Sequence, residues 1–299
     1  MERNTAKRTL EKLLSVCICL CMLGAMLPAQ VFAEEADTAQ TEIVQDTAPK
    51  DTVYLSSADD LIQLAKDCRL DSWSQNRTVV LEADIDLSSV DFNGIPSFGG
   101  TWEGQNHAIT GLSLSQDGSV QGLFRYVQQG ALVRDMTVKG RIKPGGTRAS
   151  VGGIAGSNAG TIENCAFDGV VSGTSQIGGI AGVNTVKGSI NGCTVSGTVY
   201  GSHFVGGVVG QNDGVAANCT NVASVNTTVS QNEVKLNDLT LDDVLKTEKA
   251  NDVTDAGGIA GNNAGVLRAC INRGTIGYSH IGYNVGGITG SQTGYVEGC

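Results

Sequence analysis

Paired carboxylates are the first candidate for chemistry in this sequence. Asp84 and Asp86 alternate along one predicted strand and would therefore share a face, with Asp91 close by. Paired carboxylates cleave glycosidic bonds, and clustered oxygens bind calcium. No basic residue recurs beside them as the base of a lyase would require. A polysaccharide lyase or hydrolase is therefore kept as an alternative function, and we assign no catalytic residue.

Three histidines occur, but none lies in the H-E-x-x-H sequence of zinc proteases. His107 belongs to a turn over residues 104–107, whereas His203 and His280 precede glycine pairs at different distances. We interpret all three as turn and surface residues. The sequence therefore predicts no metal site and no cofactor.

Six of the nine cysteines lie beyond residue 33, and after Cys68 they recur at long intervals: Cys165, Cys193, Cys219, Cys270 and Cys299. Zinc sites normally use ligand pairs about two to four residues apart, so this spacing argues against zinc. Stacked cysteines would be close enough for disulfides, but in-register side chains point in parallel. Buried free thiols that pack as small hydrophobic groups are the favoured interpretation, and their redox state stays open.

A repeated glycine pair shows how the chain positions these cysteines. Each block resembles "VGGIAGSNAGTIENC", in which an asparagine and a cysteine follow the pair. The first glycines are 26, 28, 51 and 29 residues apart, and we interpret the interval of 51 as two periods. A fixed period of this length is typical of a solenoid. Besides the cysteines, the predicted structural repeat residues are Gly152, Gly153, Asn158, Gly178, Gly179, Asn184, Gly206, Gly207, Asn212, Gly257, Gly258, Asn263, Gly286 and Gly287.

The segment after each cysteine predicts the fold. Apolar positions alternate from Cys165 to Val171, as in a strand with one buried face, and Met136 replaces the cysteine in an earlier lap. Short strands separated by glycines predict an all-β fold, a right-handed parallel β-helix with laps about 4.8 Å apart. We expect the glycines at corners with positive φ or at close backbone approaches. The asparagines should form left-handed corners and stack their amides, until Gln292 breaks the ladder.

Residues 53–77 are predicted to form an N-terminal capping segment, because an open solenoid end invites aggregation. Ser57 and Asp60 resemble a capping box, and an apolar helix face follows, made of Leu61, Ile62, Leu64, Ala65 and Cys68. The β-helix then spans residues 78–299, with 78–88 as its first rung. We assign four larger aromatic residues to packing: Trp73, Phe98, Trp102 and Tyr126.

The N-terminus predicts export. A basic start, an apolar run and small residues before Ala33 indicate a secretory signal over residues 1–33, and an acidic flexible linker over 34–52 follows. No second apolar run is long enough for a transmembrane segment. The signal holds four basic and two acidic residues, so its removal changes the net charge from −10 to −12, which argues against nucleic-acid partners. Cys299 falls in the middle of a lap, so we expect further laps or domains beyond it.

An insertion over residues 222–255 interrupts the repeats, and it is rich in acidic residues. Loops that project from a solenoid often carry its binding residues. The candidate binding residues are Asp238, Asp242, Asp243 and Glu248. A degenerate lap with a solvated surface is the alternative interpretation.

The whole pattern over residues 53–299 resembles the GLUG-motif repeats of exported bacterial surface proteins. Besides the five glycine-pair blocks, the resemblance is carried by "SSADDLIQLAKDC", "VVLEADIDLS", "FGGTWEGQNHAITGLSL" and "QGLFRYV". Such repeats also precede the catalytic domain of immunoglobulin A-cleaving zinc metalloproteases. The insertion departs from the family pattern.

The resemblance implies a surface-exposed β-helical array for adhesion or display, with no catalytic residue in the repeats. We therefore expect an exported non-enzymatic module that contacts a host or neighbour-cell surface protein or glycan. One alternative is the non-catalytic N-terminal region of a secreted zinc metalloprotease. The other is a β-helical polysaccharide lyase or hydrolase.

Overall fold

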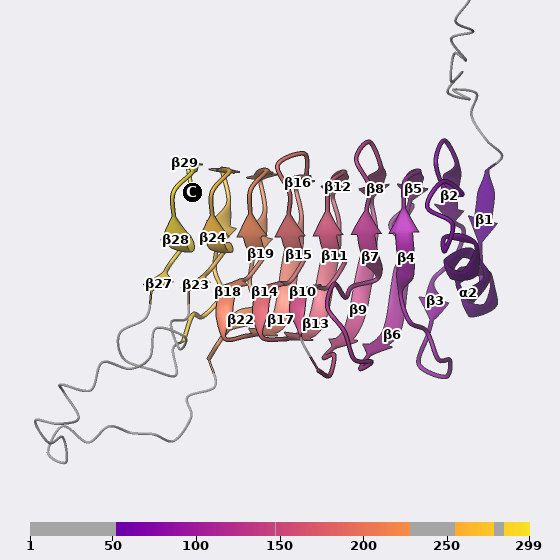
Figure 1. The fold of residues 1–299 in the computed structure, drawn as a ribbon, viewed down its shortest axis with the longest axis horizontal. Coiled ribbons are helices and arrows are strands. Elements are labelled where there is room, and N and C mark those ends of the chain that lie inside the picture. The colour runs from indigo at the N-terminus through magenta and orange to yellow at the C-terminus, as the bar shows by residue number, and fades with distance from the viewer. Residues whose placement is uncertain (1–51, 147, 228–254, 278–283) are drawn as a thin grey trace, which may run out of the picture. The chain divides into compact units, whose positions relative to one another are not determined.

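Over the residues that the structure describes, the chain folds as a parallel β-solenoid with a short helix near the solenoid's N-terminal end, which confirms the predicted fold class. The computed structural model describes residues 52–146, 148–227, 255–277 and 284–299. Strands of successive laps pair in parallel and in register, and they build four sheets along the solenoid (Figure 1). In the complete laps the chain passes through the four sheets in a fixed order, which we name C, A, B and D.

Sheets A and B form two of the walls. Sheet A contains β1 (Val53–Leu55), β2 (Thr78–Leu81), β5 (Thr101–Glu103), β8 (Leu132–Arg134), β12 (Thr161–Glu163), β16 (Ser189–Asn191), β20 (Val215–Ala217), β25 (Val266–Arg268) and β29 (Tyr295–Glu297). Sheet B contains β3 (Ile85–Asp86), β6 (Ala108–Leu114), β9 (Thr137–Ile142), β13 (Ala166–Ser172), β17 (Thr194–Tyr200), β21 (Thr220–Asn221), β22 (Ser224–Val225) and β26 (Ile271–Asn272). Because β1 pairs with β2, sheet A begins one strand before the predicted first rung.

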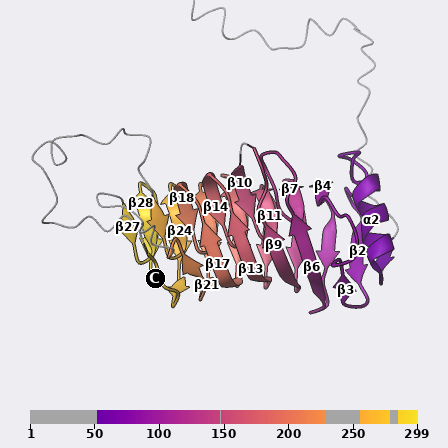
Figure 2. The ribbon, with the colours of Figure 1, turned by 90° about the horizontal axis from the view of Figure 1, so that it is seen from below.

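Sheets C and D form the other walls of the solenoid. Sheet C contains β4 (Ile95–Phe98), β7 (Phe124–Val127), β11 (Ala155–Asn158), β15 (Ala181–Asn184), β19 (Val209–Asn212), β24 (Ala260–Asn263) and β28 (Thr289–Gln292). Sheet D starts later, with β10 (Ala149–Gly152), β14 (Ser175–Gly178), β18 (His203–Gly206), β23 (Ala256–Gly257) and β27 (Val285–Gly286). Figure 2 labels strands of both, such as β24 and β11 of sheet C and β14 and β10 of sheet D.

The glycine pairs lie at the turn from sheet D into sheet C, where the chain passes very close to itself. A Cβ at Gly152 would overlap the carbonyl oxygen of Ala155, and a Cβ at Gly153 would overlap the Phe167 ring. None of the described pair glycines has a φ in the left-handed region, so close approach explains them and the positive-φ alternative is wrong. The left-handed corner is instead the residue before each cysteine or Met136, as at Asn164.

A buried amide ladder joins the laps inside sheet C. Asn158 Nδ2 donates to Asn184 Oδ1 at 2.8 Å, Asn184 to Asn212 at 2.8 Å, and Asn212 to Asn263 at 2.7 Å. All four side chains are fully buried, and each also bonds to backbone groups, so their polar atoms are satisfied. These asparagines do not have positive φ, so the predicted left-handed corners are wrong. Gln292 does not break the ladder, because its Oε1 accepts from Asn263 at 3.0 Å.

The N-terminal end is covered by α2 (Ala58–Asp67), as the sequence predicted. The Ser57 side chain accepts a hydrogen bond from the Asp60 backbone N–H, and the Asp60 carboxylate accepts from the Ser56 N–H at 3.0 Å. Leu61 and Leu64 are buried. The helix thereby covers the apolar interior, where Phe98, Trp102 and Phe124 pack with ring centroids 5.2–5.9 Å apart.

The long interval between glycine pairs is one lap and not two. Gly206 of β18 pairs directly with Gly257 of β23, so the laps on either side stack on each other. The interpretation of the insertion as a degenerate lap is therefore wrong. Its first described residues continue sheet B, because β22 pairs with β17, so the predicted boundary at residue 222 is also too early. The binding candidates Asp238, Asp242, Asp243 and Glu248 lie outside the described residues.

Replacing Asn184 with leucine should destabilise the solenoid. The substitution deprives Asn212 Oδ1, Gly188 O and Val215 O of their shared donor, and buried polar groups without partners cost about 1–3 kcal/mol each. We expect the free energy of unfolding to fall by about 2–4 kcal/mol, measured by circular dichroism in urea. Asn262→Ala, on the partly exposed face of β24, is the control and should change it by less than about 0.5 kcal/mol. Equal stability of the two variants would contradict a role for the ladder.

Candidate functional site

The repeat cysteines form a column at the start of sheet B. Cys165, Cys193, Cys219 and Cys270 are buried and free, whereas Cys299 is free and exposed. Each thiol donates to the backbone carbonyl two residues earlier, at sulfur–oxygen distances of 3.2–3.5 Å. Because a backbone carbonyl and a neighbouring lap surround each of the four buried sulfurs, these four side chains pack and bond as part of the core.

The environment of these thiols keeps them protonated. Neighbouring thiols and burial raise the pKa values of Cys193, Cys219 and Cys270 far above the usual range, and burial raises the pKa of Cys68 to about 12. The thiolate is the nucleophile and the metal ligand, and it is not populated at neutral pH in these surroundings. At neutral pH Cys68, Cys193, Cys219 and Cys270 are therefore poor nucleophiles.

Asp84 and Asp86 make separate local contacts. Asp84 Oδ1 accepts from the Ala108 N–H at 2.8 Å and lies 3.1 Å from His107 Nδ1. Asp86 accepts from the backbone N–H and the hydroxyl of Ser88 at 3.0 and 2.9 Å. These hydrogen bonds lower the pKa of both carboxyls, first through the backbone N–H groups of Ala108 and Ser88. A general acid for sugar cleavage needs a raised pKa, so the pair lacks that property.

Side chains of the types that bind metal ions are spread along the solenoid. Among the described residues, no group of three His, Cys, Asp or Glu side chains is placed to hold a metal ion. His203 begins β18, and His280 lies outside the described residues. Within the same described ranges, no helix has the length and apolarity needed to cross a membrane.

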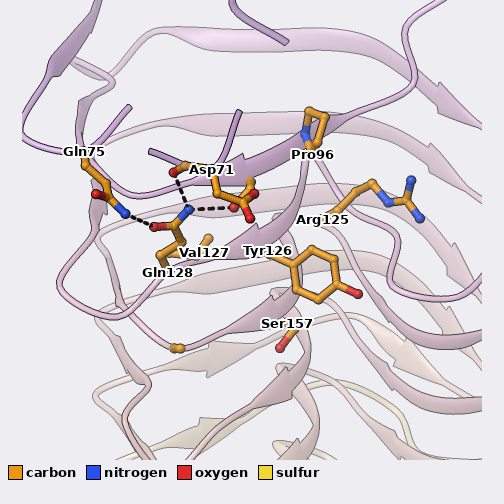
Figure 3. Close-up of a pocket in the computed structure, with 10 residues that line it drawn as sticks. Asp71, Gln75, Pro96, Arg125, Tyr126, Val127, Gln128 and Ser157 are labelled. Carbon is orange, nitrogen blue, oxygen red and sulfur yellow. Dashed lines mark hydrogen bonds between the residues drawn. The ribbon is translucent and has the colours of Figure 1, made fainter. Parts of the chain in front are cut away.

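A concave groove lies beside the N-terminal cap. It has a volume of about 820 Å³ and lies where sheet C meets the segment after α2. Its chemically useful lining residues are Asp71, Gln75, Ser97, Arg125, Tyr126 and Ser157 (Figure 3). The volume is within the usual range of about 300–1,000 Å³ for ligand sites. We refer to it as the cap groove.

Gln128 fixes one wall of the cap groove. Its Nε2 donates to the Asp71 carbonyl at 2.8 Å and to Ser97 Oγ at 2.7 Å, and its Oε1 accepts from Gln75 Nε2 at 3.0 Å. Ser74 Oγ also accepts from the Gly99 N–H at 2.8 Å. The cap segment is thus tied to sheet C, and the groove is preformed (Figure 3).

Tyr126 was missed as a site residue. Its prediction as a packing residue is wrong, because the side chain is 47% exposed and lines the cap groove. Phe98 and Trp102 are buried as predicted, and Trp73 packs partly against the core under the Arg77 guanidinium. Only the register observed in the structure, in which Tyr126 stands next to Ser157, shows that a large ring occupies a column of smaller side chains.

Arg125 forms the opposite side of the groove, across Tyr126 from Gln128 (Figure 3). Its Nε donates to the Val120 carbonyl at 3.1 Å, and its Nη2 donates to the Ser119 carbonyl at 3.3 Å. These two bonds orient the guanidinium, and among the described residues they leave Nη1 for other contacts. The groove therefore combines an aromatic ring, a carboxylate, amides, hydroxyls and one cation.

Comparison with known proteins supports the fold. No family model matches the chain. Over 171 residues, 51% of this chain, it is 28% identical to halomucin of Haloquadratum walsbyi, of whose length the match spans only 2%. A solved structure from Bacteroides ovatus, provisionally described as an immunoglobulin A1 protease, superimposes with a TM-score of 0.56 at 20% identity. That match covers 82% of this chain and 74% of the other, and it shows a shared β-solenoid fold.

The cysteine column predicts selective alkylation. When the native chain is treated with iodoacetamide at neutral pH, we expect Cys299 to react, because it is exposed. Cys165, Cys193, Cys219 and Cys270 should stay unmodified until urea unfolds the chain, since only a thiolate within reach of the reagent reacts. Peptide mass spectrometry measures each site, and the unfolded sample is the control. Native labelling of Cys193 as fast as Cys299 would contradict the buried column.

Proposed function

We propose that this chain is a non-enzymatic repeat module of an exported bacterial surface protein and serves adhesion or display. The secretory signal over residues 1–33 and the acidic linker over 34–52 support a secreted or cell-surface location. The resemblance to GLUG-motif repeats and the solenoid fold are consistent with this role. Its partner would be a host or neighbour-cell surface protein or glycan.

The preformed cap groove is the observation that carries the proposal. The asparagine and cysteine side chains are used inside the solenoid for hydrogen bonds between and within laps. Asp84 and Asp86 are held as ionised acceptors by their own backbone contacts. The groove in contrast presents partly exposed polar side chains around Tyr126. A rigid rod with such a groove suits binding and spacing better than catalysis.

A second candidate function is the non-catalytic N-terminal region of a secreted zinc metalloprotease. The structural similarity to the Bacteroides ovatus protein favours this alternative. Both functions give the solenoid a binding or spacing role, and they differ in the domain that accompanies it. Sequencing the gene beyond the codon for Cys299 distinguishes them: an H-E-x-x-H motif supports the protease, and further laps with a wall-anchoring signal support the adhesin.

The proposed function predicts attachment without turnover. The purified chain, fluorescently labelled, should bind saturably to host or neighbouring bacterial cells, as measured by flow cytometry. An equally labelled globular protein of similar net charge serves as the control for nonspecific binding. Incubation with pectin-like polysaccharides should release no unsaturated uronides, which absorb in the ultraviolet. Steady release of these products, or attachment no greater than the control, would contradict the proposal.

A further inference from the structure

Tyr126 occupies a distinctive position on the outer face of sheet C. In each strand of this sheet, one column of side chains points outward, and β-pairing places Ser97 and Ser157 on either side of Tyr126. Later members of the column, such as Val183 and Gln211, are partly buried. The phenol ring therefore stands between two small hydroxyl side chains, with almost half of its surface accessible.

Polar groups with unused hydrogen-bonding capacity surround this ring. Within the part of the chain that the structure describes, the Asp71 carboxylate and Ser157 Oγ have no hydrogen-bond or ion-pair partner. Arg125 keeps Nη1 for a ligand after its two backbone contacts. The negative charge of the Asp71 carboxylate offsets the positive charge of the Arg125 guanidinium, so the groove has no strong excess of either charge. This arrangement suits a neutral ligand with many hydroxyl groups better than a polyanion.

A peptide that adds a strand fits this location less well. β4 is the edge strand of sheet C at the cap, but Pro96 within it has no N–H to offer. The segment held by Gln128 also lies against this edge. Strand addition needs an open row of backbone donors and acceptors, which the edge does not provide.

We infer that the cap groove binds a short neutral oligosaccharide with one sugar ring stacked on Tyr126. The C–H face of a pyranose ring packs on an aromatic ring, while its hydroxyls bond to carboxylate, amide and guanidinium groups. Asp71 accepts from sugar hydroxyls, and Gln75 and Arg125 donate to sugar oxygens. The inference deepens the proposed function and rests on it, since it names the class of partner that the surface module recognises.

Rigidity of the groove strengthens the inference. Gln128 bonds to three groups from two parts of the chain, so the wall that carries Asp71 and Gln75 is ordered before a ligand arrives. Tyrosine loses little conformational entropy on binding because it has few rotatable bonds. Binding to a preformed site avoids the cost of ordering loops, which matters for ligands as weakly bound as sugars.

The test measures sugar binding by the purified full chain. The probes are cellotriose, maltotriose and triacetylchitotriose. Their binding to the chain is measured by saturation-transfer NMR and by calorimetry. We expect saturable binding of at least one probe, and a loss of about three- to tenfold in affinity in Tyr126→Ala. Tyr126→Phe keeps the ring and should retain most of the affinity. Asp71→Asn should weaken binding without changing the fold, checked by circular dichroism.

Tyr295→Ala is the matched control, because Tyr295 is a similarly exposed tyrosine on sheet A, at 53%. It should bind the probes like the unmodified chain. Equal losses in Tyr126→Ala and Tyr295→Ala, or no binding of any probe, would overturn the inference. Binding of an extended hexapeptide that depends on Tyr126, with no sugar bound, would also overturn it in favour of a peptide site.

Cell attachment separates the two proposals. If the chain attaches to cells but binds none of the three sugars, only the sugar inference fails. If a sugar binds through Tyr126 but the chain does not attach to cells, only the proposed surface role fails. Attachment that is weakened by Tyr126→Ala and competed by the bound sugar would support both.

Discussion

In-register stacking of parallel laps is the constraint on which the rest of this structure depends. Most strands satisfy their backbone groups with the laps before and after them, so paired side chains lie above their counterparts, apart from a register shift between β6 and β9. Stacked identical polar side chains can then bond in series, as Asn158 and Asn184 do inside sheet C. The same geometry makes the chain intolerant of Cβ atoms where it turns, which explains the pair at Gly152 and Gly153.

Stacking also decides what the interior can contain. Column positions tolerate residues of different size and type, so Met136 and Cys165 occupy equivalent places, and Asn221 continues a column begun by apolar residues. Asn221 is tolerated because its Nδ2 donates to Asn272 Oδ1 at 2.9 Å and to a nearby carbonyl. In the regular laps, stacked polar side chains therefore bond to one another and are not available to bind a ligand. A binding site forms more readily where the repeat is broken, as at the cap groove.

Much of the architecture followed from sequence patterns. The period of the glycine pairs, the alternation after Cys165 and the helix signal at Ser57 predicted the solenoid, its strands and its cap. The interval of 51 residues was misread, because a sequence period cannot distinguish a lap from an excursion between paired strands; only the pairing of Gly206 with Gly257 does. Sequence patterns also did not predict the cap groove. Gln128 and Asp71 are far apart in the sequence, and they meet only because the Gln128 side chain donates to the Asp71 carbonyl.

Local patterns were enough to identify the residues that must recur: glycine where backbones nearly touch, asparagine where amides stack, and a small sulfur side chain in the column. Local patterns suffice for these because each lap repeats the same environment. The tertiary structure alone decided that Tyr126 is exposed, that Gln292 completes the amide ladder, and that Asp84 faces His107. These outcomes depend on which side chains from adjacent laps lie next to each other. The register between laps decides this, and it exists only in the folded solenoid.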